Sequence, residues 1–423
     1  MKNDHFFSII FYALHRLLRG NVHKPEDIAE KFQTPVYVYN EESLRKHMHS
    51  VATVITKYPY TANYSVKANT NLSILKIALE EGLNCDAMST GEITLLEHAG
   101  FPANRIFFVP NNVSDDELKF AIEHGIITSL DSLSQLESFG QINRGGRCAV
   151  RINPGVGAGH HEKVVTAGKK TKFGIAEEDI DEIFDIAAKY DLKIVGINQH
   201  IGSLFMQPDP YLAAVTNLLR IAKRFKNLEF IDFGGGYGIP YHKLDDEAEY
   251  DMADFSKRLE PILDEFVADY GYAPLFKSEP GRYCVAESSV ILGRVHSVKQ
   301  NNGVKYVGTD IGMNVLVRPS MYDSWHDIEI IRSGKVVSRE DCEEITVTGN
   351  ICESGDLLAK GRMLPKGIQK GDLACVLDTG AYGYSMCSTY NSRPRPAEVL
   401  ITKDGEVREI RRRETIEDLM RLF

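Results

Sequence analysis

The feature that most limits how this chain can fold is a regular alternation of short apolar runs and longer amphipathic runs between about residues 36 and 285. The strand-like runs lie at 36–39, 62–66, 105–109, 126–130, 148–152, 193–197, 229–233 and 275–279. The helical patterns lie at 41–56, 71–81, 91–99, 114–124, 176–189, 210–225 and 253–269. Strands that alternate with helices of this length predict βαβ units and parallel pairing. About eight such units favour a (β/α)8 barrel, with an open doubly wound sheet as the alternative.

The last third of the chain has a different rhythm. After residue 288 the runs VILGRVHSV, VKYVGT, EITVTG, LACVLD, AEVLIT and EVREIR are strand-like, and turn-like segments such as QNNG and KDGE connect them. We therefore expect a barrel over residues 41–287 and a mostly antiparallel β domain over 288–423. Residues 1–40 are expected to supply an N-terminal helix, at 6–18, and a lead-in strand that pack on the β domain.

Composition narrows the possible partners and compartments. A formal net charge of −10 argues against a nucleic-acid partner, which would need a basic surface. Seven cysteines without a CxxC pair argue against a disulfide framework and a zinc ribbon, and favour a reducing, cytoplasmic compartment. The apolar segment 6–18 is shorter than the roughly 20 residues that cross a bilayer. We expect no metal site and no membrane partner.

The polar groups that could carry chemistry follow predicted strands. Lys67 follows ANYSV, His200 and Ser203 follow KIVGIN within HIGS, a glycine triplet at 234–236 follows EFIDF, and Glu279-Pro-Gly-Arg282 follows LFKS. In a barrel, all four places line the C-terminal mouth, where barrel active sites are built. Each group also has a simpler interpretation: a surface lysine, a structural histidine, a tight turn, and a carboxylate paired with Arg282.

Taken together, these groups indicate a cofactor. A glycine triplet lets backbone N–H groups approach a phosphate, although DFGGGYG lacks the spacing of dinucleotide or P-loop sites. A buried Glu279 needs a partner, which could be a protonated ring nitrogen of a ligand. A lysine amine, a phosphate cradle and a carboxylate opposite a ring nitrogen are the parts that hold pyridoxal 5′-phosphate (PLP).

Longer motifs give the chain a family resemblance. SVKAN, HIGS, GGGYG and EPGRY are followed by CESGD (352–356), GAYGYSM (380–386) and YNSRPRPAEVL (390–400). In this order, from about residue 27 to the end, they resemble the fold type III (alanine racemase-like barrel) PLP-dependent decarboxylases. Within that group the chain is most similar to the diaminopimelate decarboxylases.

The resemblance implies roles for the matching residues. Lys67 would form the Schiff base, His200 would stack on the cofactor ring, and Glu279 would face its nitrogen. The phosphate would be held by Ser203, Gly234, Gly235, Gly236, Gly281, Arg282 and Tyr382. The substrate would be held by Arg282, Arg318, Tyr322, Glu353 and Tyr382. Cys352 would protonate the carbanion left by decarboxylation from the neighbouring subunit, which implies a homodimer with shared active sites.

The implied activity is decarboxylation of meso-2,6-diaminopimelate to L-lysine and CO2. Arginine forks suit a distal carboxylate and Glu353 suits a distal ammonium. Three places depart from the family pattern: Asn198 before Gln199-His200, VPNN at 109–112, and Ala167 before Gly168. The alternatives are a decarboxylase of ornithine, arginine, lysine or carboxynorspermidine type, a PLP-barrel racemase, and a binding homologue without catalysis.

Overall fold

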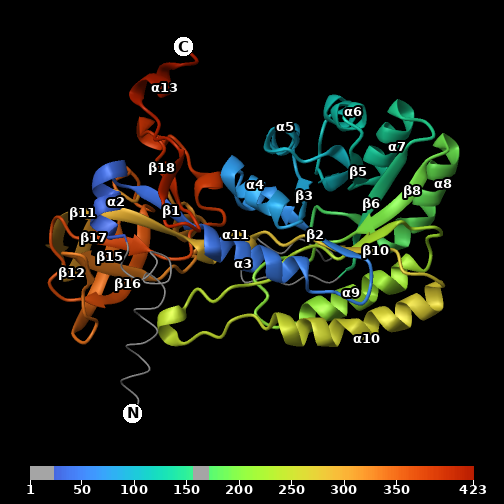
Figure 1. Cartoon of the computed structure of the whole chain (residues 1–423). Coiled ribbons are helices and arrows are strands. Elements are labelled where there is room, and N and C mark those ends of the chain that lie inside the picture. The colour runs from blue at the N-terminus through green and yellow to red at the C-terminus, as the bar shows by residue number, and fades with distance from the viewer. Residues whose placement is uncertain (1–22, 156–170) are drawn as a thin grey trace. The chain divides into compact units, whose positions relative to one another are not determined.

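The computed structural model describes residues 23–155 and 171–423 and divides the chain into two compact units (Figure 1). One unit comprises Arg45–Ile239 and Glu249–Cys284. The other comprises Pro240–Ala248, Val285–Phe423 and the described part of Met1–Leu44. The helix predicted at 6–18 and the departure at Ala167 lie outside the described residues.

The first unit is a closed parallel barrel. Its strands are β2 (Tyr60–Ser65), β3 (Asn84–Ala87), β4 (Ile106–Phe108), β5 (Ile127–Leu130), β6 (Arg147–Asn153), β8 (Lys193–Asn198), β9 (Phe230–Asp232) and β10 (Leu275–Ser278). Neighbours pair in parallel in the order β5-β4-β3-β2-β10-β9-β8-β6, and a β5–β6 pairing closes the ring. The short β7 (Ile175–Ala176) pairs with β6 outside this ring. The prediction of a (β/α)8 barrel is confirmed, and the open sheet is wrong.

Helices follow the strands around the barrel. They are α3 (Glu41–Ala52), α4 (Leu72–Glu80), α5 (Thr90–Ala99), α6 (Asp115–Glu123), α7 (Leu133–Ile142), α8 (Ile180–Tyr190), α9 (Asp209–Ala222), α10 (Met252–Tyr270) and the short α11 (Arg282–Val285). Side-chain caps begin several of them; Ser114, for example, accepts from the Glu117 N–H in a capping box before α6. A core of buried side chains, including Leu136, Leu218 and Leu263 of the helices, packs against the strands.

Aromatic and small residues fill the barrel interior. Phe107 and Phe230 meet edge to face with ring centroids 5.3 Å apart, and both belong to a buried cluster with Ala149 and Val195. Gly196 faces this cluster: a Cβ there would lie 2.2 Å from the Phe230 ring, so only glycine leaves the ring its space. The barrel is therefore a packed core, and a site can form only at its ends.

Three differences from the sequence patterns need correction. The run at 36–39 was counted with the barrel strands, but β1 (Val36–Asn40) pairs with β11 (Ser289–Asn301) and β18 (Ala397–Ile401) in the second unit, which agrees with the lead-in strand expected on the β domain. The barrel strand missed by the pattern is β3, whose sequence NCDA is short and carries a buried Asp86. The helix α7 was also missed, although its apolar residues recur every three positions within LSQLESFGQI. Short strands are the elements that periodicity detects least well.

The second unit is built on a ten-stranded sheet. Besides β1, its strands are β11 (Ser289–Asn301), β12 (Val304–Thr309), β13 (Ile328–Arg332), β14 (Lys335–Val336), β15 (Cys342–Thr348), β16 (Leu357–Pro365), β17 (Leu373–Val376), β18 (Ala397–Ile401) and β19 (Val407–Arg411). The main path is β14-β13-β17-β11-β1-β18-β19, with β12, β15 and β16 branching from β11. All pairings are antiparallel except β1–β18 and β12–β15. The predicted antiparallel β domain is confirmed, although β13, β14 and β16 were not anticipated.

Short helices accompany this sheet: α2 (Pro25–Phe32), α12 (Arg318–Tyr322) and α13 (Ile416–Met420).

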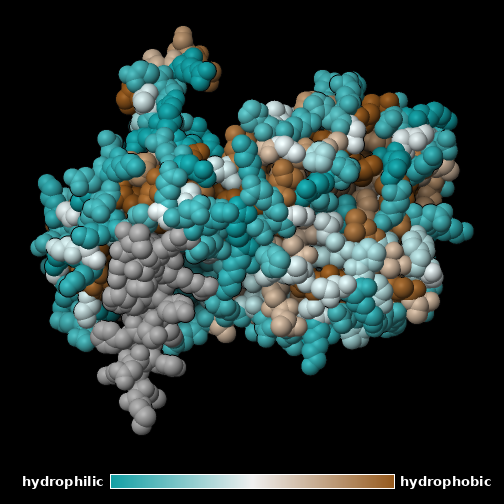
Figure 2. Space-filling view, viewed as in Figure 1, coloured by the Kyte–Doolittle hydropathy of each residue, from teal (hydrophilic) through white to brown (hydrophobic). Residues whose placement is uncertain are grey.

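Hydrophilic residues cover most of the face shown in Figure 2. Among the helices of residues 23–155 and 171–423, none combines the length and apolar character that a membrane crossing requires.

Glu329 on β13 makes the second unit's stability depend on pH. It is 1% exposed, and neither carboxylate oxygen has a hydrogen-bond partner among the described residues. Burial, reinforced by the negative charges of Asp327 and Asp378, raises its pKa to about 8. An unfolded glutamate ionises near its ordinary pKa, so between these two values only the native state keeps the proton. Stability should therefore fall as pH rises through this window, by up to about 1.4 kcal/mol per pH unit.

We expect Glu329→Gln to remove this dependence. The variant should match the wild type near pH 5 and become progressively more stable than it towards pH 8, because glutamine cannot ionise. Denaturant unfolding followed through Trp325, the single tryptophan, measures the difference. The exposed Glu344, on β15 of the same sheet, provides the control variant Glu344→Gln. A stability difference that is the same at every pH would contradict the prediction.

Candidate active site

Lys67 lies in a 3-10 turn, Val66–Ala68, that follows β2 directly. The polar residues after it hold this turn in place. The Tyr64 hydroxyl donates to the Asn69 carbonyl at 2.9 Å, and Asn69 Oδ1 accepts from the Asn71 N–H at 3.0 Å. Asn71 in turn caps α4 by accepting from the Ser73 N–H at 2.9 Å. The run KANTN is therefore a rigid strand-to-helix connection that fixes Lys67 at the barrel mouth.

Glu279 stands beside this turn at the end of β10. Ser65 joins the two strand ends, because its hydroxyl donates to the Glu279 carbonyl and its N–H donates to the Pro280 carbonyl, both at 3.2 Å. The Glu279 side chain is 3% exposed, and its Oε1 has no hydrogen-bond partner among the described residues. Burial raises the pKa of Glu279, while the positive charge of Lys67 acts in the opposite direction. Such a carboxylate is ready to accept from a ligand.

The structure adds buried charges that the sequence analysis did not single out. Asp86 on β3 and Asp232 on β9 have raised pKa values, because they are buried and lie near the negative charge of Glu279. Arg151 on β6 is 6% exposed, and the Lys277 ammonium lies 3.9 Å from the centre of the Phe230 ring. The sequence did contain a signal for these residues, because they are charged and lie inside otherwise apolar strands. Burying a charged side chain is costly unless it is paired or has a function.

His200 follows β8 and is neutral. Burial, together with the positive charges of Lys67 and Arg151, holds its pKa well below the usual range. The Gly235 N–H donates to His200 Nδ1 at 3.2 Å, so the ring proton is on Nε2. A neutral imidazole held by the backbone offers a flat face to a ligand and adds no charge.

The glycine triplet after β9 is required by close packing. Gly234 and Gly236 have φ of +76° and +126°, and a Cβ on Gly235 would lie 1.9 Å from the Glu279 carbonyl oxygen. The Gly234 carbonyl accepts from the Glu279 N–H at 2.9 Å and from the Tyr211 hydroxyl at 2.7 Å. The triplet therefore sets the position of Glu279. The Gly234 N–H donates to Asp232 Oδ1 at 2.9 Å and the Gly235 N–H to His200 Nδ1, so the triplet also joins the ends of β8, β9 and β10.

We expect Gly235→Ala to weaken cofactor binding by about tenfold or more. The added methyl group would overlap the Glu279 backbone and displace either the triplet or the carboxylate, and overpacking of this kind costs about 1–3 kcal/mol. Cofactor retained after dialysis is the measurement. Gly91→Ala, on α5 of the same unit, is a suitable control because its nearest contact would be 3.7 Å away. Equal retention in both variants would contradict the expected role of Gly235.

Arg282 and Ser203 complete the barrel mouth. The Arg282 guanidinium is buried, at 5% exposure, and its Nη2 donates to Ser203 Oγ at 3.1 Å. Gly281, directly before Arg282, is also buried. A cation, a hydroxyl and several backbone N–H groups in one unit form a set of donors suited to a phosphate. The simpler interpretation from the sequence, an ion pair between Arg282 and Glu279, is not what the structure shows.

The remaining predicted residues belong to the second unit. Arg318 is 2% exposed; its Nη1 lies 2.7 Å from His326 Nε2, and its guanidinium stacks on the Tyr241 ring at 4.8 Å. Tyr322 ends the short helix that Arg318 begins. Tyr382 is held at φ +57°, a left-handed conformation that is uncommon for a tyrosine and concentrated at functional sites.

Cys352 and Glu353 lie in an exposed segment of the same unit. The Cys352 N–H donates to Asn391 Oδ1 at 2.7 Å, which links CESGD to the YNSRPRP motif. Asp356 anchors the segment by accepting from the Met313 and Ile351 N–H groups at 2.6 and 2.8 Å. Cys352 is thus a free, exposed thiol on a well-anchored loop.

The barrel residues fit PLP. The unpartnered, buried Oε1 of Glu279 suits a protonated ring nitrogen, and the Arg282 guanidinium with the Ser203 hydroxyl suits a phosphate. Lys67, at the same strand ends, supplies the amine that PLP enzymes use as a covalent anchor. A PLP-binding barrel enzyme is the class that this fold and this arrangement of groups define.

Comparison with known proteins makes the assignment specific. Residues 41–286 match the family described as pyridoxal-dependent decarboxylase, pyridoxal binding domain. The diaminopimelate decarboxylase of Methanothermobacter thermautotrophicus is 41% identical over 93% of this chain and 92% of that protein. The crystal structure of diaminopimelate decarboxylase from Helicobacter pylori complexed with L-lysine is 32% identical with a TM-score of 0.85, covering 94% of this chain and 98% of that one. The chain belongs to the diaminopimelate decarboxylase family, and it is a PLP-dependent carboxy-lyase.

A more distant structure shares the fold alone. The lysine/ornithine decarboxylase of Vibrio vulnificus complexed with putrescine has a TM-score of 0.75 at 21% identity, covering 90% of this chain and 97% of that one. The barrel and β domain are therefore common to decarboxylases with different substrates. Substrate choice must depend on particular side chains.

Proposed function

We propose that this chain decarboxylates meso-2,6-diaminopimelate, releasing CO2 and L-lysine. The observation that carries the proposal is near-complete coverage by diaminopimelate decarboxylases, including 37% identity to the protein of Archaeoglobus fulgidus over 90% of this chain. The presence of Arg318 and Glu353 in this chain supports the proposed substrate. The substrate carries a carboxylate and an ammonium at the end that does not react, and these residues offer one group for each.

The residues of the barrel unit, together with Tyr382 of the second unit, would hold and tune the cofactor. Lys67 would anchor it covalently through its amine, and Glu279 would hold a proton on its ring nitrogen. His200 would lie against the ring, while Ser203, Gly234, Gly235, Gly236, Gly281, Arg282 and Tyr382 would bind the phosphate. When bound, PLP supplies an electron-accepting ring that makes loss of CO2 from an amino acid feasible.

The residues of the second unit, together with Arg282 of the barrel unit, would hold the substrate and move a proton. Arg282, Arg318, Tyr322, Glu353 and Tyr382 would orient the amino acid so that the departing carboxylate stands perpendicular to the ring. The Cys352 thiol would then deliver a proton to the carbon that lost CO2. Lys67, His200 and Cys352 are therefore the residues that we propose take part directly.

We also propose a cytoplasmic homodimer in which Cys352 and Glu353 serve the site of the partner subunit. The exposure of their segment supports this, because a proton donor must reach a site to act. None of the seven cysteines forms a disulfide, as a reducing compartment requires. The family match to 41–286 supports a cofactor-binding barrel over 41–287, and we propose with it a β domain over 288–423 and an N-terminal part over 1–40.

The proposal is tested by CO2 release from four substrates supplied separately to the PLP-loaded enzyme. Meso-diaminopimelate should be decarboxylated, and L-lysine, L-ornithine and L-arginine should give rates lower by two orders of magnitude or more, because buried substrate-binding groups left unpaired are costly. A preference for ornithine, arginine or lysine would contradict the substrate assignment while leaving the PLP chemistry intact.

A further inference from the structure

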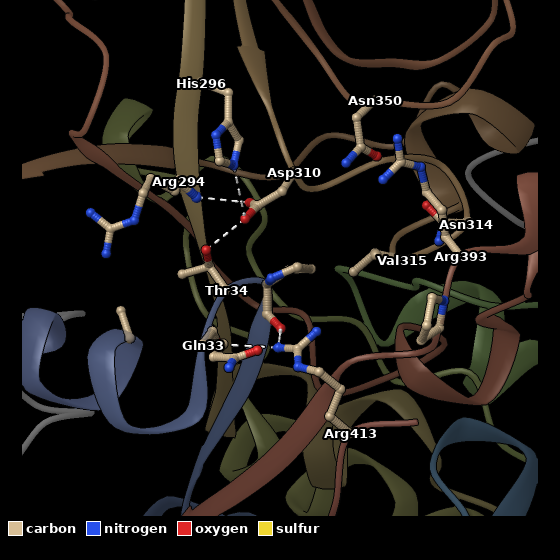
Figure 3. Close-up of a pocket in the computed structure, with 13 residues that line it drawn as sticks. Gln33, Thr34, Arg294, His296, Asp310, Asn314, Val315, Asn350, Arg393 and Arg413 are labelled. Atoms are coloured by element: carbon tan, nitrogen blue, oxygen red, sulfur yellow. Dashed lines mark hydrogen bonds and ion pairs between the residues drawn. The ribbon is translucent and has the colours of Figure 1, made fainter. Parts of the chain in front are cut away.

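A second cavity lies entirely within the β-domain unit. Its volume is about 520 Å³, within the range of roughly 300–1,000 Å³ common for small-ligand sites. Figure 3 shows the side chains that surround it, and most of them are polar. They come from the end of α2, from β11, from the segment after β12, and from the segments that contain Asn350, Arg393 and Arg413.

Three buried polar atoms around this cavity have no hydrogen-bond partner within residues 23–155 and 171–423. They are Asn314 Oδ1, Asn350 Oδ1 and Arg413 Nε. Buried polar groups are satisfied in the large majority of cases, and each orphaned group costs about 1–3 kcal/mol. Three such atoms on one cavity therefore indicate a polar occupant. The occupant must donate to the two oxygens and accept from the guanidinium.

The two amide oxygens converge on one place. Both lie against Gly312, where a Cβ would meet Asn314 Oδ1 at 2.7 Å and Asn350 Oδ1 at 3.1 Å. Asn314 is only 3% exposed, so its oxygen cannot turn to bulk water. Two convergent acceptors suit an ammonium group, which carries three donors.

The cationic groups suit an acid. Arg413 Nη2 is held by the carbonyls of Phe32, Gln33 and Pro35, which leaves its Nε–H for a ligand. Figure 3 shows Arg413 beside Gln33 at the cavity. Arg393 is exposed, and its guanidinium makes no ion pair or hydrogen bond with the described residues.

The one carboxylate on the wall is already engaged. Asp310 accepts from the Arg294 N–H at 2.7 Å and the Thr34 hydroxyl at 2.6 Å, and it lies 3.5 Å from His296 Nε2 (Figure 3). Its oxygens are therefore occupied by donors of the protein. Arg294, Arg393 and Arg413 also line the cavity, and none of them forms an ion pair with the described residues, so the wall carries more positive than negative charge.

We propose that this cavity is a second binding site for a free α-amino acid. Its ammonium would donate to Asn314 and Asn350, and its carboxylate would accept from Arg413 and Arg393. None of the residues that line it is proposed to hold PLP or the substrate, and the proposal does not depend on the proposed substrate. No covalent step is involved.

The site is placed to act on Cys352. Asn350 is two residues before Cys352, and Asp356 ties this segment to Met313, the residue before Asn314. A ligand that bridges Asn314 and Asn350 would hold both segments and reduce the motion of the loop that carries the thiol. Occupancy should therefore alter turnover as well as stability.

The test is equilibrium dialysis of the PLP-loaded enzyme with labelled L-alanine, L-glutamate and L-lysine, each alone. At least one should bind at a site whose Kd rises tenfold or more in Asn314→Leu and in Arg393→Gln. Arg393 is exposed, so its variant keeps the test valid if Asn314→Leu does not fold. Arg408→Gln, an exposed arginine on β19, is the matched control and should bind like the wild type.

Two outcomes would overturn the proposal. One is that no amino acid shows binding sensitive to Asn314 or Arg393, as water alone in the cavity would give. The other is that unlabelled acetate or methylammonium displaces the label as well as the amino acid does, so that only one charge is recognised. Failure of the proposed function would instead appear in the CO2 assay, which these measurements do not use.

Discussion

Lys67→Ala should lose the long-wavelength absorbance of the lysine-linked cofactor and reduce CO2 release to the background without enzyme. The amine is the only group of the strand-end cluster that can anchor PLP covalently, and it stands on a turn fixed by Asn69 and Asn71. Lys67→Arg should fail equally, because a guanidinium stays protonated and cannot act as a nucleophile. Absorbance spectra and borohydride fixation of the cofactor measure the link, and CO2 release measures turnover.

The matched control is Lys76→Ala, an exposed lysine on α4, the helix that follows the turn. It should keep both the absorbance and the activity. If Lys67→Ala retained activity within tenfold of the wild type, or if borohydride fixed the cofactor elsewhere, the assignment of Lys67 would be wrong.

Cys352→Ala should separate cofactor binding from turnover. The variant should keep the absorbance, because Cys352 belongs to the β-domain unit and the covalent anchor belongs to the barrel unit. Turnover should fall by about 10²–10⁴-fold, the usual range for loss of a group that transfers a proton. Steady-state kinetics should show the loss in kcat with little change in KM, because the thiol acts after the substrate has bound.

Cys342→Ala on β15 is the control, since this thiol is also free and lies in the same unit but outside the CESGD motif. It should behave like the wild type. An active Cys352→Ala enzyme would remove the thiol from the proton-transfer step and leave the cofactor assignments untouched.

The proposed homodimer with shared active sites makes a further prediction for these two variants. A mixture of Lys67→Ala and Cys352→Ala subunits that exchange freely should recover about a quarter of wild-type activity, because half of the dimers are hybrids with one intact site. No recovery after confirmed subunit exchange would show that each chain uses its own Cys352.

The alternation of apolar and amphipathic runs was enough to predict the barrel, because the period of two for strands and 3.6 for helices is written locally. The apolar run before each of Lys67, His200, Gly235 and Glu279 was enough to place these residues at strand ends. The order of the motifs was enough to identify the family. Local patterns encode these properties because each depends on a few consecutive residues.

Other properties depend on pairings between distant residues, and these only the tertiary structure decided. It showed that β1 pairs with β11 and β18, and it supplied β3 as the missing barrel strand. It showed that Gly235 must be glycine because the Glu279 carbonyl, distant in sequence, occupies the space of a side chain. It also gathered the unsatisfied atoms of Asn314, Asn350 and Arg413 around one cavity. Burial and hydrogen-bond satisfaction are properties of the folded neighbourhood, so no local pattern in the chain can carry them.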